Sequence, residues 1–313
     1  MNKIILVPII IGAALLTAGG VLLGVAVVKG SNPSNKVHNE YDLNETINSF
    51  DIDTDITDIE FVASDSKKLV FEESDKYYHT YSVNDGVLTI KSKNEKKWYD
   101  FIGMNFSVKA TIYLPGGSYS NLKIKNSTGD VTLPKEFAFD SGNIKLSTGG
   151  LDIKSNFITS YEVETSTGNQ YYADLTAKNM KIKASTGNVN LDGVKVEETL
   201  DINVSTGRIN LKNVTAKNYK SHSSTGNVIF DNTIIAEHLE VETSTGDVKF
   251  IDSDAATLKI QTDTGDVKGT LLTNHRFVVE TDTGKPDYPK YTDGGLCEIE
   301  TDTGDIKISI KAA

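Results

Sequence analysis

The chain has 313 residues, a net charge of −11 and a pI near 5.0, so it lacks the basic surface by which proteins bind nucleic acids or anionic lipids. Its single cysteine, Cys297, excludes an intrachain disulfide, so packing and hydrogen bonds have to stabilise the fold.

An uncharged apolar segment opens the chain at residues 4–28, between Lys3 and Lys29. As a helix it would span about 37 Å at 1.5 Å per residue, more than the roughly 30 Å hydrocarbon core of a bilayer. A signal peptide cut near Ala18 is the alternative, although its apolar run is usually only about 7–15 residues. We therefore predict an uncleaved transmembrane anchor at 1–28, a polar linker at 29–45, and an extracellular body.

Residues 46–120 are β-rich but lack the repeat described below. Candidate strands cover residues 55–63, 67–73, 87–93 and 106–115. An open-ended repeat stack needs an atypical closing element, so this segment is predicted to be an N-terminal cap. Within it, lysines precede Trp98, Tyr99 and Phe101, a composition that suits contact with a membrane or a protein partner. The alternative is that these aromatic side chains fill the core of the cap.

From residue 121 to 313 the dipeptide Thr-Gly recurs ten times, in steps of 19 or 20 residues. A strict period of this length indicates a repeat architecture in which equivalent positions stack. The residue before Thr-Gly is Ser in seven copies and Asp in the last three. A glycine can adopt the positive φ of a sharp corner, so we interpret this repeated tripeptide as a structural turn. The turn glycines are Gly129, Gly149, Gly168, Gly187, Gly207, Gly226, Gly246, Gly265, Gly284 and Gly304.

Apolar residues alternate with polar residues on both sides of each glycine, which is the periodicity of strands. An array of hairpins would give less regular spacing. We therefore predict an all-β fold: a single-stranded β-solenoid, similar to a parallel β-helix, with about ten coils of 19–20 residues. In this register Cys297 lies seven residues before Gly304, at a position that faces the core.

The order of these parts resembles a bacterial family of β-strand-repeat envelope proteins that carries the label "putative adhesin". The resemblance rests on the apolar N-terminus, the strand DITDIEF from Asp55, IYLP at 112–115, and LKIKNSTGDV from Leu122. It covers roughly residues 46–313 and implies an envelope protein, often of Gram-positive bacteria. The family pattern contains no catalytic residues.

The last three repeats carry Asp-Thr-Gly, the signature of aspartic proteases, at Asp263, Asp282 and Asp302. Those enzymes need two such loops facing each other across a cleft, whereas here the motif is a variant of the Ser-Thr-Gly turn. Three carboxylates stacked at the coil spacing would repel one another and could bind a cation. No cofactor is predicted, with calcium at these three residues as a minor alternative.

These observations predict a structural or interaction module of the bacterial cell envelope, without catalysis. Its partner would be an envelope protein or a cell-wall polymer. The alternative is a carbohydrate-active β-helix enzyme or a binder of cell-wall polysaccharide, which would need a lateral groove with convergent carboxylates.

Overall fold

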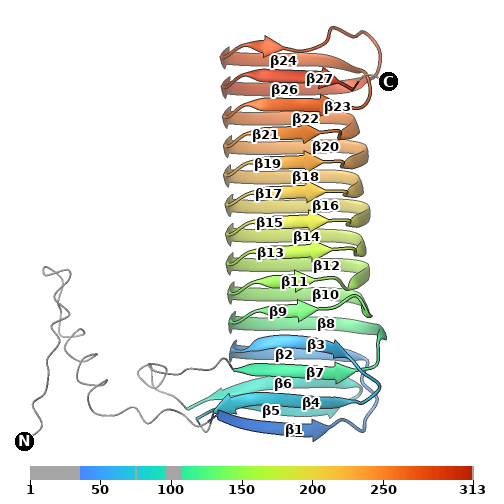
Figure 1. The fold of residues 1–313 in the computed structure, drawn as a ribbon, viewed down its shortest axis with the longest axis vertical. Coiled ribbons are helices and arrows are strands. Elements are labelled where there is room, and N and C mark those ends of the chain that lie inside the picture. The colour runs from blue at the N-terminus through green and yellow to red at the C-terminus, as the bar shows by residue number, and fades with distance from the viewer. Residues whose placement is uncertain (1–35, 75, 96–107, 312–313) are drawn as a thin grey trace, which may run out of the picture.

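A computed structural model describes residues 36–74, 76–95 and 108–311, and these residues form a long β-solenoid (Figure 1). Each coil has a long strand and a short strand on either side of the Thr-Gly turn. The long strands are β8 (Gly117–Thr128), β10 (Phe137–Thr148), β12 (Asn156–Thr167), β14 (Thr176–Thr186), β16 (Lys195–Thr206), β18 (Thr215–Thr225), β20 (Ile234–Thr245), β22 (Asp254–Thr264), β24 (His275–Thr283) and β26 (Gly295–Thr303). The short strands are β9 (Val131–Leu133), β11 (Leu151–Ile153), β13 (Gln170–Ala173), β15 (Val189–Asp192), β17 (Ile209–Lys212), β19 (Val228–Asp231), β21 (Val248–Ile251), β23 (Val267–Leu271), β25 (Pro286–Asp287) and β27 (Ile306–Ile310).

Strands of each kind stack in parallel and in register along the rod. In β14, for example, Ile182 lies opposite Val163 of β12 and Ile202 of β16, and all three side chains are buried. Because alternate residues face inward, each coil adds its apolar side chains to one continuous core. The predicted all-β solenoid of about ten coils is confirmed.

The N-terminal strands form a further coil and a cap. They are β1 (Lys36–Asp42), β2 (Ser49–Ile56), β3 (Asp58–Ala63), β4 (Lys68–Ser74), β5 (Tyr77–Asn84), β6 (Val87–Asn94) and β7 (Lys109–Leu114). β2 and β3 pair in parallel with β8 and β9, so they are a coil that lacks the turn glycine, with Thr57 in its place. β1 pairs with β4, and β5 with β6, in antiparallel fashion.

Three of these strands, β1, β2 and β3, lie inside segments for which the sequence predicted another role. β1 lies inside the predicted linker 29–45, so residues 36–42 belong to the folded body, where β4 supplies their pairing. The coil of β2 and β3 lies inside the predicted cap 46–120. Whether a domain boundary lies at residue 120 therefore remains a prediction. The parallel stack of coils already includes β2, which begins at Ser49 within the predicted cap.

The order of coils along the rod differs from the order along the chain at both ends. β26 lies between β22 and β24, and β27 lies between β23 and β25. In the same way β2 lies between β6 and β8. The last three repeats therefore occupy adjacent layers, as expected, but not in chain order: the final repeat of the chain occupies the penultimate layer, and β24 forms the end of the rod (Figure 1).

The glycines of the turns are needed for two reasons. Seven of them, Gly129 to Gly246, have positive φ, between 130° and 157°, as predicted. Gly265, Gly284 and Gly304 do not have this conformation, so positive φ cannot explain them. At each of the three, a Cβ would lie within 3.0 Å of a backbone oxygen of the adjacent coil. Close stacking of the turns therefore requires glycine even where the backbone dihedral does not.

Cys297 is fully buried in β26, opposite Leu258 of β22, which confirms the predicted inward register. Burial raises the pKa of its thiol to about 12, so almost no thiolate is present at neutral pH. We expect the folded protein to react with a thiol reagent only as fast as this coil opens. Stoichiometric labelling within the mixing time, compared with the denatured chain, would contradict the inward register.

Some predictions concern residues outside the described ranges. The predicted anchor, residues 4–28, is among them, and so are Trp98, Tyr99 and Phe101. Among the residues that are described, none forms a helix of the length and apolar character needed to cross a membrane.

Candidate interaction surfaces and buried polar sites

The turns form a polar edge along the rod, and the Asp or Asn that follows most of the turn glycines stabilises it. Asp247 Oδ1 accepts a hydrogen bond from the backbone N–H of Asp266, and Asp266 Oδ1 accepts one from Asp305, at 3.0 and 2.7 Å. Asp305 Oδ1 in turn accepts from the Lys285 N–H at 3.0 Å. These bonds follow the spatial order of the coils. The signal was present in the sequence, since Asp or Asn follows most of the turn glycines.

Asp263, Asp282 and Asp302 lie on this edge, and their side chains are exposed. Because β26 lies between β22 and β24, Asp302 is the middle member of the row and Asp282 the terminal one. No three His, Cys, Asp or Glu side chains in the described part of the chain are arranged to hold a metal ion. The calcium hypothesis gains no support from this geometry and stays a prediction.

A buried polar chain joins the cap to the first coil. His79 Nδ1 lies 2.8 Å from Glu73 Oε2, and His79 Nε2 lies 2.9 Å from Thr57 Oγ1. An acid, an imidazole and a hydroxyl in this order resemble a nucleophilic triad. The Thr57 side chain, however, is only 1% exposed and also contacts the Tyr77 hydroxyl at 3.2 Å. These hydrogen bonds satisfy buried polar groups at the corner where Thr57 replaces the turn glycine. Because Thr57 is buried, no substrate can reach its hydroxyl.

A second buried pair lies where the chain skips a layer. His275 Nε2 donates to Asp254 Oδ1 at 2.8 Å, and both side chains are almost completely buried. Asp254 Oδ2 also accepts from the N–H groups of Leu272 and Thr273, at 3.1 and 2.7 Å. Burial alone would raise the pKa of Asp254, but the hydrogen bonds from His275 and Thr273 outweigh it and lower the pKa below 3.8. Sequence analysis missed this pair, because its members are 21 residues apart and carry no motif.

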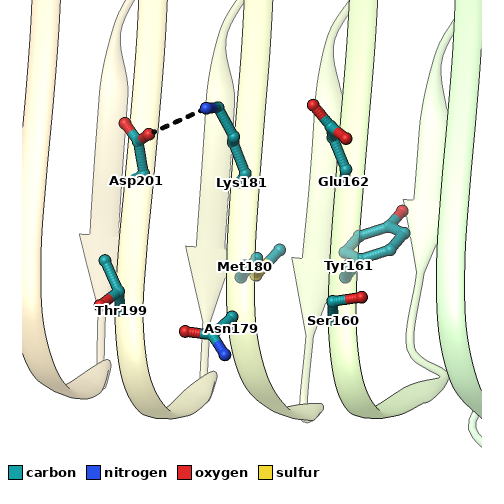
Figure 2. A pocket seen from close by; sticks show the side chains of 8 residues that line it. All are labelled: Ser160, Tyr161, Glu162, Asn179, Met180, Lys181, Thr199 and Asp201. Atoms are coloured by element: carbon teal, nitrogen blue, oxygen red, sulfur yellow. Dashed lines mark ion pairs between the residues drawn. The ribbon is translucent and has the colours of Figure 1, made fainter.

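The side of the rod formed by the long strands has a shallow hollow of about 320 Å³ (Figure 2). Its floor contains Tyr161 and Met180, and Glu162, Lys181 and Asp201 form a row beside it. Lys181 pairs with Asp201 at 3.6 Å and separates it from Glu162. Similar pairs, such as Lys220–Glu240 at 3.1 Å, recur along the rod. The row is therefore part of a repeated ion-pair pattern and not a local pair of catalytic carboxylates.

A larger hollow of about 620 Å³ lies at the C-terminal end, between β23, β27 and the loop after β25. The rings of Tyr288 and Tyr291 line it together with Asp287, Lys307 and Ser309. Lys290 Nζ lies 3.4 Å from the centre of the Tyr288 ring, and Tyr291 is 41% exposed. Aromatic rings beside hydroxyl and charged groups could bind a sugar, but one carboxylate provides no acid–base pair for glycoside hydrolysis.

Comparisons agree with this architecture. Residues 47–309 match the protein family described as Toastrack DUF4097. A solved structure from Parabacteroides distasonis, described as a "putative adhesin", aligns over 88% of this chain and 97% of its own, with 13% identity and a TM-score of 0.50. A "putative adhesin" from Parabacteroides merdae aligns over 76% and 95%, with 15% identity and a TM-score of 0.48. No curated protein matches the chain. At this identity the structural likeness concerns the fold alone.

Proposed function

The chain belongs to the Toastrack DUF4097 family, and we propose that it acts as a membrane-anchored, extracellular interaction module of the bacterial cell envelope. The observation that carries the proposal is the continuous rod itself, with ion pairs on its outer surface and two open, shallow hollows. Such a solenoid is suited to hold a surface at a distance from its point of attachment. Neither of the hollows provides paired catalytic carboxylates, which favours binding over catalysis.

The anchor in this proposal is the uncharged segment at residues 4–28, and the partner is an envelope protein or a cell-wall polymer. One observation favours the polymer. The C-terminal hollow presents Tyr288 and Tyr291 beside Asp287 and Lys307, a combination typical of saccharide binding. Binding of cell-wall polysaccharide at this hollow is therefore the second candidate function.

The anchored, outward topology is tested with a membrane-impermeant amine reagent on intact cells. Lys123, Lys125 and Lys212 are well exposed on the rod, so the reagent should modify them as fully as in lysed cells. Mass spectrometry of the same material should recover peptides that contain residues 1–28. A cytoplasmic protein, unlabelled until lysis, is the control. Lysines that react only after lysis would contradict the outward orientation, and a mature chain that starts near residue 20 would contradict the anchor.

A further inference from the structure

The last layer of the rod has a free edge. β24 pairs with β26 on one side, and no strand in the described ranges pairs with it on the other side (Figure 1). Its residues His275–Thr283 therefore present unpaired N–H and C=O groups at the end of the stack. Natural proteins usually protect such an edge, because it is a template for pairing with another strand.

The outward face of this edge strand differs from that of the other coils. Val278 is 59% exposed, more than any other large hydrophobic side chain in the described residues. Because the strands pair in register, Val278 is aligned with one outward-facing residue in each of the preceding layers. In all of those layers the position is polar or charged: Asp51, Lys123, Asn143, Glu162, Lys181, Asp201, Lys220, Glu240, Lys259 and Glu298. This row of outward-facing residues becomes apolar only at β24, the last layer of the rod. An apolar residue is expected there if a strand of another chain pairs with β24 and covers Val278.

The charges on either side of Val278 complement each other under two-fold symmetry. Arg276 and Glu280 are exposed and lie two residues before and after it, on the same face of the strand. If two copies of β24 pair in antiparallel orientation about an axis at Val278, each Arg276 lies opposite Glu280 of the second copy. The two valines then meet at the centre. A parallel pairing in register would instead place like charges opposite each other, which is unfavourable.

We propose that the free edge of β24 binds the same edge of a second copy of this chain, joining two rods end to end at their C-terminal layers. The symmetry is isologous, so the contact closes as a dimer and does not propagate. The backbone of β24 supplies the hydrogen bonds of a new antiparallel ladder, and the Arg276–Glu280 pairs select its register. This inference does not depend on the proposed anchoring or on any envelope partner.

Sedimentation velocity of the full chain tests the proposal. At about 100 μM protein, where association with a micromolar Kd is saturated, we expect the mass of a dimer. Val278→Lys should raise the dissociation constant at least about tenfold, because two lysines would then face each other. Ile158→Lys is the matched control, since Ile158 is 55% exposed but lies in β12 in the body of the rod, and it should leave the dimer intact.

Charge exchange tests the register. Arg276→Glu and Glu280→Arg should each give monomers, and the double variant should restore the dimer with the charges reversed. All four positions are exposed, so circular dichroism should show folded protein for every variant. A wild-type chain that is monomeric at this concentration overturns the proposal. So does an association that Val278→Lys and both single charge variants leave unchanged, since it would have to lie elsewhere.

Discussion

Replacing Gly207 by valine is expected to destabilise the solenoid by about 3–5 kcal/mol, among the largest effects of a single substitution. Gly207 has a φ of +147°, which a β-branched residue adopts only with strain. A Cβ at this position would also lie within 3.0 Å of the backbone oxygen of Gly187 in the adjacent coil. The turns cannot move apart to make room, because the Gly187 and Gly207 N–H groups both bond to the next coil at 2.9 Å.

The control for this substitution is Lys212→Val, five residues further along the same coil. Lys212 is exposed and pairs with Asp192 only at 3.7 Å, so its replacement should cost less than about 1 kcal/mol. Denaturant midpoints of the two variants and the wild type give the comparison. Equal midpoints for Gly207→Val and Lys212→Val would show that the turn glycine is not a required corner.

Asp254→Ala is expected to cost about 3–5 kcal/mol, because it leaves several buried donors without an acceptor, at about 1–3 kcal/mol each. The substitution leaves the His275 ring and the N–H groups of Leu272 and Thr273 without their acceptor. Its control is Asp263→Ala in the same strand, β22, where the carboxylate is exposed. If the two alanine variants unfold at the same denaturant concentration, the buried pair does not hold the chain where it skips a layer.

The same site predicts a loss of stability in acid. The folded-state pKa of Asp254 is lower than its ordinary value of 3.8, so the ionised carboxylate stabilises the fold at pH values above 3.8. That contribution is lost as the pH falls through the lowered pKa. The difference in unfolding free energy between the wild type and Asp254→Ala should therefore narrow below about pH 4, and denaturant titrations at several pH values measure it. A difference that stays constant into strong acid would contradict the assigned ionisation.

The solenoid could be predicted from the sequence because its signals are local to each repeat. The spacing of Thr-Gly and the alternation of apolar residues define one coil and its inward face, down to the burial of Cys297. The coil of β2 and β3 was missed because Thr57 replaces the glycine, although Phe50, Ile52 and Ile59 keep the apolar spacing of the repeat. A search for the tripeptide alone cannot detect such a coil.

The order of layers could not be predicted, for a physical reason. Similar repeats present similar edges, so β22 can pair with β24 or with β26, and the pattern of apolar residues is satisfied either way. The difference lies in single contacts, such as the Asp254–His275 pair at the crossing of the chain. The same ambiguity affected the candidate cation site, because its geometry depends on whether Asp282 or Asp302 lies in the layer next to Asp263.

At the end of a solenoid, the layer that has only one neighbour usually also contains the end of the chain. The placement of β26 separates these two features. Fraying starts easily where a layer has a neighbour on one side only and the polypeptide is also free to leave. Here the outermost layer, β24, is continuous with the chain in both directions, while the strands nearest the C-terminus are held by ladders on both of their sides. Neither β24 nor the pair of β26 and β27 can therefore detach from the rod without the other. In the monomer, at concentrations below the dissociation constant of the proposed dimer, amide exchange at β26 and β27 should consequently be slower than at β24.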